Sequence, residues 1–147
     1  MKKIFVIMTA FLMTLAPVTS LHAAETAKIH ATIIVASNQG NDFNLTNDAY
    51  RDQLLQLFSY KSYKQLDDII SNLERSKREV LELPDGYQLI LTLQDLDKGR
   101  VQVQAMIRKG NSRYLDTIVS ILRPGVVFLG GPPAGGGTLI IVLETGF

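Results

Sequence analysis

The chain has 147 residues, of which 46% are hydrophobic and 20% are charged, which suits a single globular domain with its own core. The formal net charge is only +1, which excludes a general electrostatic attraction to nucleic acid or to an anionic membrane surface. There is no cysteine, which excludes disulfides, thiolate metal sites, cysteine nucleophiles and a lipid-anchoring cysteine.

The first 23 residues have the three-part layout of a secretory signal peptide. A basic head of two lysines precedes an apolar run from Ile4 to Ala16, and polar residues then lead to Leu21-His22-Ala23. The apolar run is about 13 residues long, whereas a spanning helix needs about 20. We therefore predict a signal peptide over residues 1–23, bacterial export to the periplasm or the medium, and no stable membrane span after cleavage. Removing Lys2 and Lys3 leaves 13 basic against 14 acidic residues, a formal net charge of −1, on one β-rich domain over residues 24–147.

The start of this domain predicts a strand followed by a helix. Residues 29–37 form a β-branched run that ends in a turn at residues 38–41. Thr46 or Asn47 can then cap a helix over residues 47–58, whose apolar stripe comprises Tyr50, Leu54, Leu57 and Phe58. The segment 62–73 is ambiguous between helix and strand. Its apolar residues recur at helical spacing after a capping-box pattern at Ser62 and Gln65, yet the segment that follows it alternates like a strand.

From residue 77 onward, alternating segments are separated by turn residues. The predicted strands are 77–83, 87–94, 100–108, 113–122, 126–129 and 138–143. With the first strand, the chain has six or seven strands and one or two helices. Early helices followed by strands in succession predict an α+β fold with a mainly antiparallel sheet or sandwich.

The glycine-rich stretch 130–138 superficially resembles a phosphate-binding loop. Gly137 occupies the position of the required lysine, and the residues after it are strand-like rather than helical, so we predict no nucleotide binding. A flexible loop joining two adjacent strands is the simplest interpretation. The same stretch can form a contact surface, because its backbone is little covered by side chains. The candidate binding residues there are Gly130, Gly131, Pro132, Pro133, Gly135, Gly136 and Gly137.

Tyr60 and Tyr63 are the other candidate binding residues. They flank Lys61-Ser62, and aromatic rings interleaved with lysine can stack on bases or sugars. Alternatively, two aromatic rings pack a junction between a helix and a strand, which is the interpretation that we favour.

No set of residues predicts a catalytic, metal or cofactor site. His30 is the one histidine left after processing, and we expect a hydrogen-bonded or exposed strand residue rather than a catalytic base. Asp67 and Asp68 are adjacent, so they point in different directions and are expected on a solvated face. Asp95 and Asp97 lack the remaining ligands of a calcium loop, and a hairpin explains them.

Several short segments are similar to those of small exported β-rich envelope proteins of bacteria that have no assigned function. They are residues 34–38, 58–63, 83–89 and 129–132 followed by Leu139-Ile140-Ile141. The resemblance implies a compact β-rich envelope domain and favours an extended conformation for residues 62–73. It carries no catalytic residues.

These features predict a non-enzymatic exported envelope module, either an accessory domain or one that binds a protein partner. A small hydrolase or ligand-binding protein with a cleft not visible in the sequence is one alternative. A small outer-membrane β-barrel is another, because residues 139–147 alternate toward a terminal aromatic residue.

Overall fold

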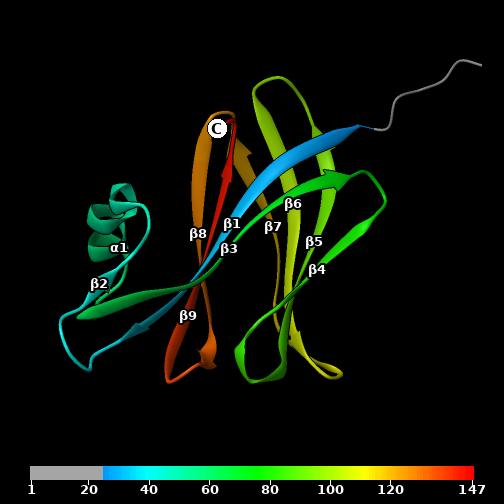
Figure 1. The fold of residues 1–147 in the computed structure, drawn as a ribbon. Coiled ribbons are helices and arrows are strands. Elements are labelled where there is room, and N and C mark those ends of the chain that lie inside the picture. The colour runs from blue at the N-terminus through cyan, green and yellow to red at the C-terminus, as the bar shows by residue number, and fades with distance from the viewer. Residues whose placement is uncertain (1–24) are drawn as a thin grey trace, which may run out of the picture.

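The computed structural model describes residues 25–147, so the predicted signal peptide lies outside the described residues. These residues form two packed β-sheets with a short helix (Figure 1). One sheet has the order β2-β3-β1-β9-β8, and its strands are β1 (Thr26–Ser37), β2 (Phe43–Asn44), β3 (Ser62–Glu74), β8 (Gly125–Ala134) and β9 (Gly137–Thr145). The other has the order β4-β5-β6-β7, and its strands are β4 (Arg78–Glu82), β5 (Tyr87–Leu96), β6 (Arg100–Lys109) and β7 (Ser112–Leu122). All strand pairs are antiparallel except β2 with β3, which confirms the predicted β-rich, mainly antiparallel fold.

The inner faces of the two sheets form the main core. Alternation along β1 turns Ile29, Ala31 and Ile33 inward, and the inward residues of β5, β6 and β9 meet them. These side chains are almost completely shielded from water. Most strands therefore have one buried face, which is the pattern expected of a sandwich, whereas parts of β1 and β9 are buried on both faces.

The outer face of the five-stranded sheet has a second, smaller core under the helical segment. This segment consists of a 3-10 turn (Asp48–Tyr50) and the helix α1 (Arg51–Leu57), with Asn47 Oδ1 accepting a hydrogen bond from Ala49 N at 3.0 Å as the cap. Tyr50 and Leu54 are buried against the outward residues of β1 and β9. Figure 1 shows α1 on the side of this sheet away from the four-stranded one. The helix predicted over residues 47–58 is confirmed, although Leu57 is 60% exposed because the helix ends there.

The ambiguous segment 62–73 is a strand. It pairs with β1 from Thr26↔Glu74 to Ser37↔Ser62, with a bulge between Ile33 and Ile34. The bulge inserts one extra residue, Leu66, and so shifts the alternation of β3 by one position. Apolar residues on one face of a regular strand are an even number of positions apart. Because of the shift, Leu66 and Ile69 are three positions apart, which is a spacing typical of a helix. Together with the two-residue strand β2, β3 raises the number of strands among residues 25–147 to nine.

The glycine-rich stretch joins two adjacent antiparallel strands, as predicted, but the expectation of a flexible loop over residues 130–137 is wrong. β8 continues to Ala134 and β9 begins at Gly137, so the turn consists of Gly135 and Gly136 alone. Their φ values of 66° and 84° are those that a two-residue hairpin turn requires. A Cβ on Gly137 would lie 2.3 Å from the Ala36 carbonyl oxygen, which explains glycine inside the strand.

Candidate functional site

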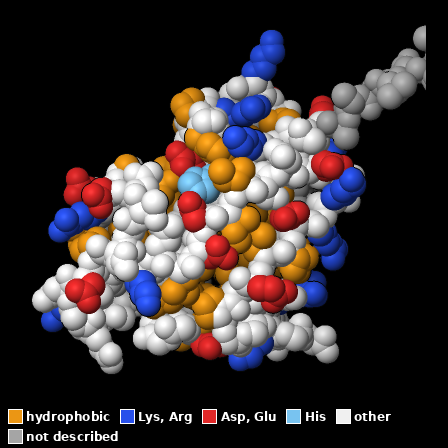
Figure 2. All heavy atoms as spheres, viewed as in Figure 1, with side chains coloured by type: hydrophobic (Ala, Val, Ile, Leu, Met, Phe, Trp, Pro, Cys, Tyr) orange, Lys and Arg blue, Asp and Glu red, His pale blue; other side chains and the backbone are white. Residues whose placement is uncertain are grey.

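The outer face of the five-stranded sheet holds a cluster of polar side chains beside the helical segment. His30 on β1 lies between Asp68 on β3 and Glu144 on β9. Its Nε2 is hydrogen-bonded to Asp68 Oδ1, and its Nδ1 lies 3.4 Å from Glu144 Oε2. Thr32 Oγ1 donates a 3.0 Å hydrogen bond to the same oxygen of Asp68. Figure 2 shows the one histidine of the described residues in pale blue, with acidic side chains around it.

Tyr50 extends this cluster to the helical segment. Its hydroxyl donates a 2.5 Å hydrogen bond to Glu144 Oε2, and its ring meets Phe128 of β8 edge-on at 5.9 Å between centroids. Burial, followed by the hydrogen bond to Glu144, raises the pKa of Tyr50 well above that of a free tyrosine. The hydroxyl is therefore a stable donor at neutral pH. A continuous set of hydrogen bonds thus joins the helical segment, β9, β1 and β3.

The geometry of this cluster defines what it can do chemically. Asp68 and Glu144 bind different ring nitrogens of His30, so their carboxylates do not converge on one point beside the ring. Within residues 25–147, no three acidic or histidine side chains are grouped so that they could hold a metal ion. Both ring nitrogens face carboxylates, and the hydroxyls of Thr32 and Tyr50 donate to carboxylates too. The cluster is therefore arranged to connect elements of the fold.

The sequence predicts the surroundings of single residues in this cluster, but it does not predict that they come together. His30 is a hydrogen-bonded strand residue, as predicted, and Asp67 and Asp68 do not converge. Asp67 and Asp68 are both exposed, as expected of a solvated face, although the Asp68 carboxylate also binds His30 and Thr32. The available signal was that His30 and Thr32, two polar residues two positions apart in a β-branched run, lie on one face of a strand. Pairing with Glu144, 114 positions away, has no local signal.

The two candidate tyrosines pack the junction between α1 and β3. Tyr63 is completely buried, and its hydroxyl donates to the carbonyl oxygens of Leu54 and Phe58, each at 3.3 Å. Tyr60 packs edge-on against it, with ring centroids 6.4 Å apart. Burial raises the pKa of Tyr63. This is the packing role that we favour from sequence, and it leaves the Tyr63 ring inaccessible to a stacking ligand.

The glycine-rich candidates lie along the end of β8 and its turn into β9. Gly130, Pro133, Gly135 and Gly136 are exposed, Gly137 is half-buried, and Gly131 and Pro132 are buried. The turn is fixed from outside, because Gly135 N donates a 2.9 Å hydrogen bond to Asp85 Oδ2. These residues are therefore brought together as one border of the five-stranded sheet.

β8 is itself an edge strand. It is hydrogen-bonded to β9 on one side, and no strand of the described residues pairs with its other side. Its ladder with β9 is regular from Gly125 to Gly130. Not one of its ten residues is charged, and Val126, Val127 and Phe128 are half-buried. Residues 125–131 of this edge contain neither a charge nor a proline, whereas edge strands are commonly protected by both, and Pro132 and Pro133 occur only near the end of β8.

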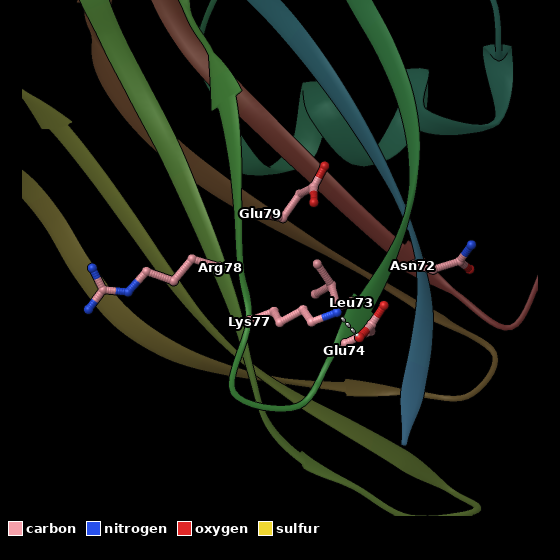
Figure 3. A pocket seen from close by; sticks show the side chains of 6 residues that line it. All are labelled: Asn72, Leu73, Glu74, Lys77, Arg78 and Glu79. Carbon is pink, nitrogen blue, oxygen red and sulfur yellow. Dashed lines mark ion pairs between the residues drawn. The ribbon is translucent and has the colours of Figure 1, made fainter. Parts of the chain in front are cut away.

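A small cleft between the ends of β3 and β4 is a further candidate. It has a volume of about 110 Å³ and is lined by Asn72, Leu73, Glu74, Lys77, Arg78 and Glu79. Lys77 Nζ lies 2.5 Å from Glu74 Oε2, while Arg78 and Asn72 point away from this ion pair in opposite directions (Figure 3). The charged groups either neutralise one another or diverge into solvent. The cleft therefore offers no set of groups aimed at one ligand atom.

Asp95 lies near the end of β5, and Asp97 lies in the turn that joins β5 to β6, where the sequence places a hairpin. Asp97 Oδ1 accepts a 2.8 Å hydrogen bond from Gly99 N within the turn, and Asp95 Oδ1 lies 3.4 Å from the Arg75 guanidinium. The two carboxylates thus have separate partners.

Comparison with known proteins finds no matching family model, no matching curated protein and no matching solved structure. Among residues 25–147, no helix is long and apolar enough to cross a membrane.

Proposed function

We propose that the chain is a non-enzymatic, exported envelope module that binds a protein partner, and that the partner adds an extended strand along the free edge of β8. The observation that carries this proposal is the uncharged edge of β8, which is paired on its β9 side only. An extended peptide that joins such an edge gains main-chain hydrogen bonds, and its alternate side chains add specificity.

The other edges of the two sheets are less suited to strand addition. β4 carries Arg78, Glu79 and Glu82 within five residues, and β7 carries Arg113 and Asp116. β2 is only two residues long, and the part of β3 that it leaves unpaired carries Asp67, Asp68 and Glu74. Charged residues on an edge oppose strand addition, because an added strand would remove water from these charges. β8 is thus the favoured edge.

The ends of the proposed binding surface follow from two prolines. Pro124 precedes β8 and Pro132 lies within it, and neither has an amide hydrogen for a ladder. The run between them, residues 125–131, is apolar or glycine. An apolar extended segment fits this run best. A charged segment would lose water on binding and would find no opposite charge on this edge.

Gly130→Lys is the variant that tests the surface. Gly130 is exposed, and a Cβ there would meet only Phe58 Cε1, at 3.7 Å, so the fold can accept a side chain. Its ammonium group would stand on the apolar edge. Gln53→Lys adds the same charge at an exposed position on α1, outside β8, and is the matched control. Envelope fractions would be passed over each immobilised protein, and captured chains identified by mass spectrometry.

We expect wild type and Gln53→Lys to capture the same polypeptide and Gly130→Lys to lose it. Hydrogen exchange on the purified pair should then show slower exchange at β8 amides. Equal capture by all three proteins would contradict strand addition at β8.

Export is tested separately by intact mass. Protein isolated from the envelope or periplasmic fraction should lack about 23 residues, as expected after signal cleavage. An unprocessed chain in that fraction would contradict the proposed export route.

A further inference from the structure

We infer that the strand that joins the free edge of β8 is β8 of a second copy, in a two-fold dimer centred on Phe128. This inference rests on the proposed function, because it names the partner of the same edge. It would join the two five-stranded sheets through one antiparallel pair of edge strands.

The sequence of the edge is close to palindromic in side-chain size about Phe128. In an antiparallel pair related by a two-fold axis, the positions of directly opposite residues have a constant sum. An axis at Phe128 places Val127 opposite Leu129 of the other copy, and Val126 opposite Gly130. Moving outward, the same axis places glycine opposite glycine and proline opposite proline: Gly125 with Gly131 and Pro124 with Pro132.

This register places Phe128 directly opposite Phe128 of the other copy, so the two rings meet at the axis. Phe128, Val126 and Gly130 share the outer face of β8, so each ring also has a glycine of the opposite copy as its diagonal neighbour. Phe128 is already held in place by the edge-on contact with Tyr50 at 5.9 Å. Little side-chain freedom remains to be lost at the centre of the interface, which lowers the cost of association.

The register also explains why the ladder would stop where it does. The prolines end regular pairing on both sides of the axis at the same distance, so neither copy would present an unmatched length of edge. A strand that meets itself about a two-fold axis places like residues close together, so a charge near the centre would face its own copy. Residues 124–132 contain no charge.

The first experiment measures the oligomeric state of the processed chain by sedimentation velocity over a range of concentrations. We expect a reversible dimer. Gly130→Lys should weaken dimerisation by at least about tenfold, because it places two ammonium groups within the interface. Gln53→Lys, on the exposed face of α1, should dimerise as wild type does.

The second experiment tests the register by cysteine cross-linking, for which the absence of native cysteine gives a clean background. Val126→Cys and Gly130→Cys are prepared separately and then mixed under oxidising conditions. The proposed axis places position 126 of one copy opposite position 130 of the other, at a separation that a disulfide can span. Equal residues lie four positions out of register. The mixture should therefore form a covalent dimer, and neither variant alone should.

A chain that stays monomeric at every concentration would overturn the inference, as would a dimer that is insensitive to Gly130→Lys or does not cross-link in the mixture. The proposed function is tested separately from the dimer. If a monomeric chain captures a different polypeptide, and Gly130→Lys abolishes that capture, strand addition at β8 stands with another occupant. If Gly130→Lys changes neither dimerisation nor capture, both proposals fail.

Discussion

The Tyr50 hydroxyl donates a 2.5 Å hydrogen bond to Glu144 Oε2, and this bond ties the helical segment to the last strand of the sheet. Tyr50→Phe keeps the ring and its contact with Phe128 but removes the donor. Because hydrogen bonds to charged groups contribute about 1.5 to 3 kcal/mol, we expect the free energy of unfolding to fall by about that amount. Urea denaturation followed by circular dichroism measures it.

Tyr114→Phe is the matched control for this change, since Tyr114 is 53% exposed on β7. Its free energy of unfolding should stay within about 0.5 kcal/mol of wild type. Equal effects of the two substitutions would mean that the bond to Glu144 does not stabilise the fold.

The raised pKa of Tyr50 predicts a loss of stability in alkali. Burial and the bond to Glu144 keep this hydroxyl protonated in the folded state, whereas a tyrosine in the unfolded chain has its ordinary pKa of 10.0. Above that pH the folded state binds more protons than the unfolded state, so the free energy of unfolding falls as pH rises. Below it both states are protonated and this contribution does not change with pH.

Denaturation curves between about pH 8 and pH 11 measure this slope. Tyr50→Phe should reduce the fall in the free energy of unfolding at alkaline pH. The fall that remains should include a contribution from Tyr63, because burial also raises the pKa of Tyr63. An unchanged slope in Tyr50→Phe would show that Tyr50 titrates alike in the folded and unfolded states.

The contact between His30 and Asp68 predicts coupling between the two residues. His30→Ala leaves Asp68 with Thr32 as its remaining side-chain donor, and Asp68→Ala leaves His30 beside Glu144. In a double-mutant cycle, we expect the double variant to lose less stability than the sum of the single losses, by about 0.5 to 3 kcal/mol. Additive losses would mean that the pair contributes nothing beyond the packing of each side chain.

How far the sequence determines this structure differs between the sheet and the site. Strands such as β5 and β6 show clear alternation and are bounded by turn residues, so their positions follow from local patterns. The bulge at Leu66 belongs to the pairing of β3 with β1 and has no signature within β3 itself, which is why this segment resembles a helix.

The polar cluster was beyond sequence reasoning for a related reason. Asp68, His30 and Glu144 come from three distant segments, and only the strand order β3-β1-β9 brings them together. Likewise, the composition of residues 130–137 favours a loop, since glycine and proline are poor strand formers. Tertiary contacts, such as the approach of Gly137 to the Ala36 carbonyl, explain glycine there without any loop.

This finding changes what a shortened β8–β9 connection should do. If residues 130–137 formed a flexible loop, deletion of Ala134 to Gly136 would cost little. In the structure, the deletion removes the two positive-φ residues of the turn, the buried Ala134 and the bond from Gly135 N to Asp85 Oδ2. Pro132 and Pro133 cannot replace the turn, because their rings fix φ near −65°.

We therefore expect the deletion to lower the free energy of unfolding by more than about 2 kcal/mol, measured by urea denaturation. Gly136→Asn is the control. A Cβ at Gly136 meets no atom within 4 Å, and asparagine tolerates the φ of 84° found there, so its cost should stay below about 1 kcal/mol. A deletion variant as stable as wild type would show that the connection behaves as a free loop after all.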